Sequence, residues 1–284
     1  MLHELPHIIV HTVKDNILLI LFLFLTYLVM EYLEHKAGGH AGRIVKKAGS
    51  AGPIIGAIVG IVPQCGFAAA AANLYTGRVI SMGTLIAIFL ATSDEVLPIL
   101  MAYPGSVSVI FFIFGLKIVV GAISGLIIDT VFPAKDDHDH IHEMCEDEHC
   151  HCEKGVFRSA LAHTLHIAIF ILLVSFVLNL VMHTVGEEAL GNLVLNRPII
   201  GQIAAAVIGL IPNCASSVVL TQLYVKGAMS FGALMSGLFV NAGVGLLILF
   251  RVNHHKEENL KIVGILLAIG IVAGIIIGFF PIFS

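Results

Sequence analysis

Charge is scarce in this chain. Only 12% of its 284 residues are Asp, Glu, Lys or Arg, whereas 58% are hydrophobic, and the mean hydropathy is +0.99. About a quarter of the residues in a soluble globular domain are charged, so the composition excludes an ordinary soluble protein. Stretches of about 20 apolar residues are long enough to cross a bilayer as helices, and uncharged stretches of that length cover residues 48–77, 198–225, 227–250 and 262–284. The sequence therefore predicts an all-α integral membrane protein.

Other absences narrow the class further. Tryptophan is absent, so anchoring at the membrane interface depends on Tyr, Lys and Arg. The five Cys do not form the evenly spaced framework of a disulfide-bonded extracellular protein. No GxxxxGK[ST] motif occurs, which argues against ATP as the driving force. The residues before Asn16 lack a basic region followed by a cleavage site, and we expect no cleaved signal peptide.

Two related tracts interrupt the apolar stretches. Residues 61–66 read IVPQCG and residues 210–215 read LIPNCA, so each tract combines Pro, an amide residue and Cys. A break in a membrane helix leaves backbone polar groups unsatisfied unless it lines a cavity, and matched breaks indicate the binding site of a transporter. The predicted site therefore includes the amides, the thiols and two hydroxyls that only the second tract has: Gln64, Cys65, Asn213, Cys214, Ser216 and Ser217.

The two tracts belong to a longer internal repeat with a constant offset of 149 residues. The matching pairs include Leu74-Tyr75 with Leu223-Tyr224, Ser81-Met82-Gly83 with Ser230-Phe231-Gly232, and Gly121 and Gly125 with Gly270 and Gly274. We therefore predict two transmembrane repeats, residues 1–133 and 156–284, joined by a hydrophilic linker at 134–155.

Each repeat is expected to contain five segments, which gives about ten in the chain. In the first repeat they are 16–34, 51–62, 67–77, 80–102 and 106–132. The two short segments form either one re-entrant hairpin or two short spans, and both possibilities leave an odd number of crossings. An odd repeat inverts its copy, so the broken helices of two inverted halves would meet near the bilayer midplane. A single bent helix over 50–77 would instead make the repeats parallel.

The basic residues predict an orientation. Loops 35–49 and 251–261 hold most of the Lys and Arg that lie in short loops, and such loops are usually cytoplasmic. The linker then also faces the cytoplasm, and both termini face outward. The expected location is the inner or plasma membrane of the cell.

Polar residues inside the predicted spans form a second group. Residues 92–95 read TSDE in the middle of 80–102, and carboxylates at that depth are functional by default. The alternative is a carboxylate near a span end that faces the headgroups. The predicted site gains Thr92, Ser93, Asp94 and Glu95, with Asn241 as the counterpart of Thr92; further candidates are Asn73, Lys117 and Gln222.

Lys117 lies near the middle of the last span of the first repeat. Its ammonium could offset the acids or respond to the charge of a bound metal, or the side chain could snorkel to the interface. Together, thiols, carboxylates and amide oxygens suit a divalent transition metal such as Mn, Zn, Fe or Co as the transported substrate. No organic cofactor is expected.

The linker carries a second predicted metal-binding region. Its candidate ligands are His138, His140, His142, Cys145, His149, Cys150, His151 and Cys152. Imidazole and thiolate are ligands of Zn, Ni, Co and Cu, and their irregular spacing predicts a flexible chelating tether. A solvated acidic linker without a metal-binding role is the alternative.

With these residues in place, the chain resembles the ten-span heavy-metal exporters of bacteria and archaea, often labelled manganese or arsenic efflux proteins. The resemblance rests on GIVPQCGF, GTLIAIFLATSDEVLPIL and GLIPNCASS, together with the His-rich loop. A weaker likeness links it to the organoarsenical permeases, which also have Cys near Pro in broken segments. The resemblance implies efflux of a metal or metalloid.

We therefore expect a secondary exporter of a divalent transition metal that works by alternating access, and not an enzyme. Proton exchange through Asp94 or Glu95 is compatible with this function, because carboxylates must lose protons to bind metal. The alternatives are an arsenite or organoarsenical permease and a membrane thiol–disulfide electron carrier that uses Cys65 and Cys214. The expected partners are the metal ion and the lipid bilayer, with no nucleic acid; a homo-oligomer is left open.

Overall fold

A computed structural model describes most of the predicted membrane segments. It covers individual residues within 20–28 and 157–176 and the ranges 51–62, 65–92, 96–101, 107–133, 199–212, 214–225 and 227–280. Within these ranges the regular structure is entirely helical. By length and hydropathy, three of the described stretches could cross a membrane: Ser108–Val131, Phe231–Val252 and Lys256–Gly278.

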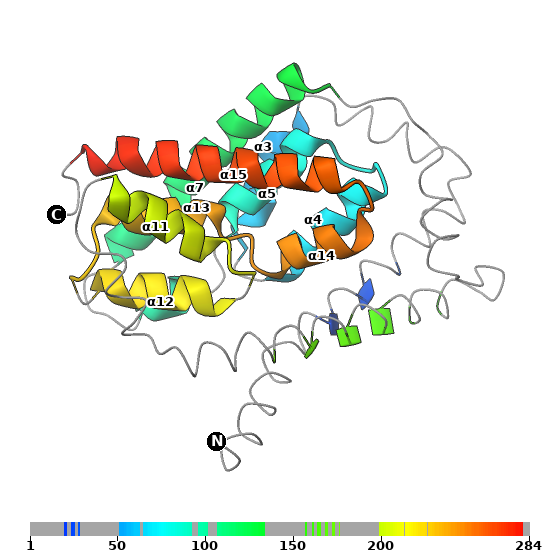
Figure 1. The fold of residues 1–284 in the computed structure, drawn as a ribbon, viewed down its shortest axis with the longest axis horizontal. Coiled ribbons are helices and arrows are strands. Elements are labelled where there is room, and N and C mark those ends of the chain that lie inside the picture. Colours follow the sequence, from blue (N-terminus) through cyan, green and yellow to red (C-terminus); the bar gives the residue numbers. More distant parts are fainter. Residues whose placement is uncertain are drawn as a thin grey trace, which may run out of the picture.

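Two sets of helices follow one another along the chain (Figure 1). The first set is α3 (Gly52–Gly60), α4 (Cys65–Thr76), α5 (Met82–Ala91), α6 (Val96–Met101) and α7 (Val107–Val131). The second is α11 (Ile200–Gly209), α12 (Cys214–Val225), α13 (Phe231–Val240), α14 (Val244–Val252) and α15 (Lys256–Gly278). Three helices of the first set begin 149 residues before their counterparts in the second set. The pairs are α4 and α12, at Cys65 and Cys214; α5 and α13, at Met82 and Phe231; and α7 and α15, at Val107 and Lys256.

The observed helices refine the predicted segments. The interruption of 51–77 is confirmed, since α3 and α4 are separate helices, and the span predicted at 106–132 corresponds to α7. The prediction of one continuous helix at 80–102 is wrong, because α5 ends at Ala91 and α6 begins at Val96. The same interruption separates α13 from α14, so each set of helices has a second break.

Each set contains a tightly packed group of three helices: α3, α5 and α7 in one set, and α11, α13 and α15 in the other. Small residues allow these backbones to approach closely. A Cβ at Gly125 of α7 would lie 2.6 Å from the carbonyl oxygen of Gly83. The equivalent Gly274 of α15 would meet the carbonyl oxygen of Gly232 at 2.8 Å. The repeated glycines are therefore packing residues of these two groups.

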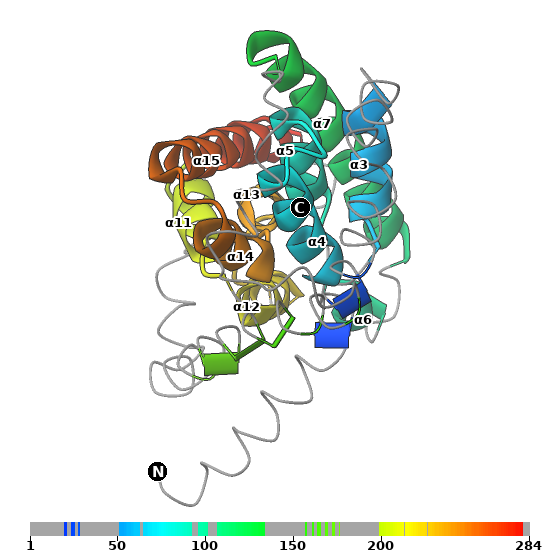
Figure 2. The same ribbon diagram turned by 90° about the vertical axis from the view of Figure 1, so that its right-hand side faces the viewer.

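Helices of one set also pack against helices of the other. α4 of the first set packs against α14 of the second, and α12 of the second packs against α6 of the first. The first of these pairs is visible in Figure 2. A Cβ at Gly245 of α14 would lie only 2.8 Å from the Cβ of Ala68 in α4, so the alanine-rich sequence of α4 permits this close approach.

Side-chain contacts give the directions of the central helices. Lys117 of α7 lies at the end of α5, whereas Gly125, two turns later, lies beside Gly83 at its beginning; α7 therefore runs antiparallel to α5. The ring of Phe112 in α7 packs against Phe231 at the beginning of α13, with centroids 5.9 Å apart, and Lys117 contacts the later part of α13. α5 and α13 therefore approach each other with their C-terminal ends.

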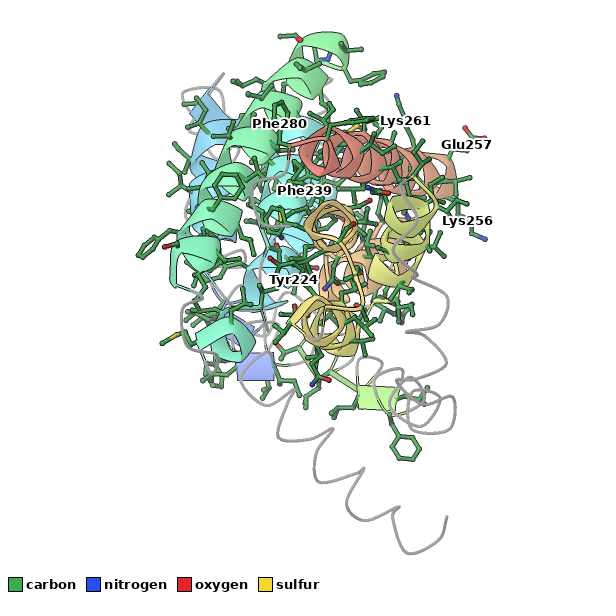
Figure 3. The ribbon with its side chains drawn as sticks, turned by 90° about the vertical axis from the view of Figure 1, so that its left-hand side faces the viewer. Tyr224, Phe239, Lys256, Glu257, Lys261 and Phe280 are labelled. Carbon is green, nitrogen blue, oxygen red and sulfur yellow. The ribbon has the colours of Figure 1, made fainter. Side chains whose placement is uncertain are left out.

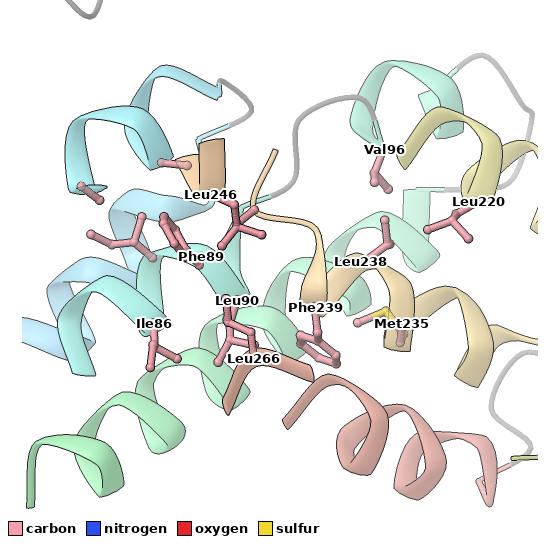
Figure 4. Close-up of a cluster of buried hydrophobic side chains, with 14 of the residues drawn as sticks. Ile86, Phe89, Leu90, Val96, Leu220, Met235, Leu238, Phe239, Leu246 and Leu266 are labelled. Atoms are coloured by element: carbon pink, nitrogen blue, oxygen red, sulfur yellow. The ribbon is translucent and has the colours of Figure 1, made fainter. Parts of the chain in front are cut away.

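The buried core surrounds this meeting point. Figure 4 shows Leu90 of α5, Leu238 and Phe239 of α13 and Leu266 of α15 grouped there, all within one hydrophobic cluster. Large apolar side chains also cover the outside, such as Ile58 of α3, which is 54% exposed. An apolar exterior of this kind matches a lipid environment.

Candidate functional site

The ends of α5 and α13 form the centre of the candidate site. α5 ends at Ala91, and Thr92 leaves the helical conformation with ψ of 130°. α13 ends at Val240, and Asn241 has extended backbone with ψ of 93°. The last carbonyls of a helix have no partner inside the helix and carry partial negative charge, so both helices present acceptors at the same place.

The turn after α13 is built by an amide and a glycine. The Oδ1 atom of Asn241 accepts a hydrogen bond from the backbone N–H of Gly243 at 3.0 Å. Gly243 has φ of +52°, a conformation that glycine adopts without steric cost. These two residues explain locally why the helix stops and why α14 begins in a new direction.

Lys117 of α7 lies between the two helix ends. Its side chain is 0% exposed, so the alternative that it snorkels to the interface is wrong. The ammonium donates to the carbonyl oxygen of Thr92 and, at 2.9 Å, to that of Leu238. Its Nζ also lies 6.0 Å from the ring centroid of Phe239, whose position in the interior is visible in Figure 3. One cation thus connects the C-terminal ends of helices from both sets.

Thr92 and Asn241, predicted as counterparts, lie at these helix ends. Both are buried, with 3% and 4% exposure. The Thr92 hydroxyl donates to the carbonyl of Ile88 at 2.8 Å, which leaves its oxygen lone pairs as acceptors. Both residues therefore bring neutral oxygen atoms to a buried position beside the freed carbonyls.

The first breaks of each half lie next to the second ones. A Cβ at Gly60, where α3 ends, would lie 2.7 Å from the carbonyl oxygen of Ile88 in α5. In the other half, Gly209 at the end of α11 meets the backbone of Gly237 in α13. The Pro–amide–Cys tracts thus begin beside the last turns of α5 and α13.

The structure places part of each tract. Cys65 and Cys214 are the first residues of α4 and α12; their side chains, like Gln64 and Asn213, lie outside the described residues. Ser216 and Ser217 are buried. The Ser216 hydroxyl donates to the carbonyl of Ile211 at 3.3 Å, across the break.

The remaining predicted residues are distributed differently. Asn73 is fully buried, and its Nδ2 donates to the carbonyl of Ala69 at 3.1 Å; Gln222 of α12 is half-buried. Ser93, Asp94, Glu95 and the eight predicted linker ligands lie outside the described residues. Within the described ranges, no three His, Cys, Asp or Glu side chains come together as a metal site.

Gln202 is a buried polar residue that the predicted site did not include. Gln202 of α11 is 5% exposed, and its Oε1 has no hydrogen-bond partner in the described part of the chain. Its backbone carbonyl accepts from the hydroxyl of Ser236 in α13 at 2.9 Å. The available signal was its place in the uncharged stretch 198–225, which contains two Gln, Gln202 and Gln222.

A second polar cluster lies at the beginning of α15. The carboxylate of Glu258 accepts from the hydroxyl of Tyr75 at 2.6 Å, from the Arg78 guanidinium at 3.0 and 3.4 Å, and from the Asn253 amide at 3.1 Å. Burial of Arg78 disfavours its charge, but the hydrogen bonds and attraction of Glu258 outweigh this, so the Arg78 pKa is raised above its ordinary value. This Glu258 cluster connects α4 to α14 and α15.

An apolar exterior, paired helix breaks and polar residues buried beside them define a multi-spanning α-helical membrane protein. The family model described as "Putative, 10TM heavy-metal exporter" matches residues 4–188, more than half of the chain, and the chain belongs to this family. The resemblance inferred from the sequence is thereby confirmed. No curated protein and no solved structure matches the chain.

Proposed function

We propose that the protein exports a divalent transition-metal cation from the cytoplasm by alternating access, and that the cation binds where the ends of α5 and α13 meet. Its family of heavy-metal exporters supports transport rather than catalysis. The observation that carries the proposal is the pair of helix C-termini converging on one buried position. In transporters, C-terminal half-helix ends and unwound carbonyls are typical cation ligands.

The directions of the helices support inverted repeats as the basis of this mechanism. α15 runs antiparallel to α13, because Gly270 lies beside Val240 whereas Gly278 lies beside Gly232. Since α7 runs parallel to α13, the equivalent helices α7 and α15 run in opposite directions. The Nζ of Lys261, near the start of α15, accordingly lies 3.4 Å from the ring centroid of Phe132, just after α7. Inverted halves around a shared site are the usual architecture for alternating access.

The chemistry at the centre favours a hard or borderline cation. Thr92 and Asn241 supply neutral oxygens, and the predicted acids Asp94 and Glu95 lie two and three residues after Thr92 in the sequence. Oxygen donors with few thiols suit Mn²⁺, Fe²⁺, Co²⁺ or Zn²⁺. Arsenite would instead need several converging thiols, and the membrane segments contain only Cys65 and Cys214.

Reconstitution into liposomes tests the proposal. Uptake of Mn²⁺, Zn²⁺ and arsenite should be compared for the wild type, Asp94→Asn, Thr92→Val and Thr130→Val. Thr130 is the matched control, because its hydroxyl also donates to a carbonyl of its own helix, at 2.7 Å, but is exposed. We expect Mn²⁺ or Zn²⁺ flux that falls at least tenfold in Asp94→Asn, falls less in Thr92→Val and is unchanged in Thr130→Val. Arsenite flux without divalent-cation flux would favour the metalloid permease, and cation flux unaffected by Asp94→Asn would refute the assigned site.

A further inference from the structure

Lys117 is not required by the packing of the fold. The equivalent position in the other half, 149 residues later, is Leu266. Both side chains are 0% exposed, and each belongs to the long helix that packs against α5 or α13 in its own set. An apolar side chain therefore fills this position in one half, whereas the other half buries an ammonium.

Burying an ammonium inside a membrane protein is costly, and such residues usually serve transport. A leucine or methionine of similar volume would avoid this desolvation. The cost is offset here by hydrogen bonds to the carbonyl oxygens of Thr92 and Leu238. These oxygens belong to the same helix ends that the proposed function assigns to the transported cation.

We infer that the Lys117 ammonium is a tethered cation that competes with the transported metal for the carbonyl oxygens at the ends of α5 and α13. This inference rests on the proposed function and adds a step to it. Without metal, the ammonium joins the two helix ends and neutralises their partial negative charge. When metal binds, it displaces the ammonium, and when metal leaves, the ammonium returns.

This competition has a kinetic consequence. A carrier that releases its metal must reorient empty, and unneutralised carbonyls in the core would oppose that step. Lys117 supplies the missing positive charge, so the empty carrier reorients with its site occupied by its own side chain. The same occupancy lowers the apparent metal affinity, because only the fraction of molecules with a displaced ammonium can bind.

Two neutral variants and two controls test the inference. Lys117→Met removes the charge, and Lys117→Gln removes it while keeping N–H donors for the carbonyls, which protects folding. Lys117→Arg keeps a cation, and Leu266→Met is the matched control at the equivalent position. Thermal unfolding identifies the folded variants. Mn²⁺ and Zn²⁺ binding is then measured on purified protein, and liposomes report net metal efflux and metal-for-metal exchange separately.

The expected result is a separation of two transport modes. The folded neutral variants should bind Mn²⁺ about tenfold more tightly than the wild type. This factor corresponds to a wild-type site that the Lys117 ammonium occupies about nine-tenths of the time, which leaves about a tenth of the molecules able to bind metal. They should keep exchange, which needs no empty reorientation, and lose net efflux by at least about tenfold. Lys117→Arg should retain net efflux, and Leu266→Met should match the wild type.

Other results would overturn the inference. Unchanged Mn²⁺ affinity in folded Lys117→Gln, or equal losses of exchange and net efflux, would make Lys117 a purely structural residue. These outcomes leave the proposed function intact, because wild-type flux remains. Absence of Mn²⁺ and Zn²⁺ binding and flux in the wild type would overturn the proposed function itself, and the inference with it.

Discussion

Replacement of Glu258 by Ala should weaken the connection between α4 and the beginning of α15. The carboxylate accepts hydrogen bonds from Tyr75, Arg78 and Asn253, and alanine would leave all three donors without this acceptor. Asn253 has a second acceptor, the Oδ1 atom of Asn259 at 2.7 Å. The largest losses are therefore expected at Tyr75 and Arg78.

The size of the effect follows from the burial of the ion pair. Removing one partner of a fully buried pair costs about 3–5 kcal/mol, whereas an exposed pair contributes about 0–1 kcal/mol. The side chains of Arg78 and Glu258 are 33% and 21% exposed, so water can replace part of the lost interaction. With the short Tyr75 hydrogen bond included, we expect the free energy of unfolding to fall by about 2–3 kcal/mol.

Thermal unfolding of the protein in detergent or nanodiscs measures this loss. Glu257→Ala is the matched control, since Glu257 is the preceding residue and lies exposed at the beginning of α15 (Figure 3); its effect should stay within about 0.5 kcal/mol. A double-mutant cycle with Arg78→Met should give a coupling of about 1–2 kcal/mol. Equal destabilisation by Glu258→Ala and Glu257→Ala, or zero coupling, would refute the reasoning.

Three further predictions concern packing, capping and the linker. Gly125→Val should reduce stability by about 2 kcal/mol or more in thermal unfolding, because its Cβ would meet Gly83 and Pro53 at 2.6–2.7 Å. Gly264→Ala is the control, since a Cβ there would have nothing within 4 Å, and it should be neutral or stabilising. A larger loss of stability in Gly264→Ala than in Gly125→Val would contradict this account. Asp129→Asn should cost about 1 kcal/mol, since Asp129 accepts from the backbone N–H of Gly83 at 2.8 Å at the start of α5; an unchanged midpoint would rule out that role. Replacing the His and Cys of 134–155 by Ser should lower the metal bound per protein molecule while leaving saturated liposome flux intact, and loss of that flux would assign the linker to the transport path.

The sequence predicted the breaks and their equivalence. Pro, an amide and Cys in an uncharged stretch disrupt helix geometry locally, and that signal needs no tertiary information. The offset of 149 residues similarly anticipated the matching starts of α4 and α12 and of α7 and α15. The second pair of breaks was missed, because Thr92 and Asn241 end their helices without a local Pro or Gly at the position itself. Gly243 was visible in the sequence, but a glycine in a membrane helix more often indicates close packing.

Lys117 marks the limit of the sequence alone. A long flexible stem allows a lysine near mid-span either to reach the interface or to remain inside, and periodicity cannot distinguish these outcomes. The tertiary structure decides between them, because α5 and α13 bring the carbonyls of Thr92 and Leu238 to the same ammonium. Those residues are far apart in sequence, and their meeting depends on how α7 packs against both helices.

The sequence by itself determined the membrane class, the repeat and the helix-breaking tracts, because composition and local backbone chemistry are properties of short segments. Only the tertiary structure decided which helix ends face each other and which polar side chains are buried between them. Convergence of two C-terminal ends on one cation requires contacts between distant segments, and a linear pattern does not contain their distances.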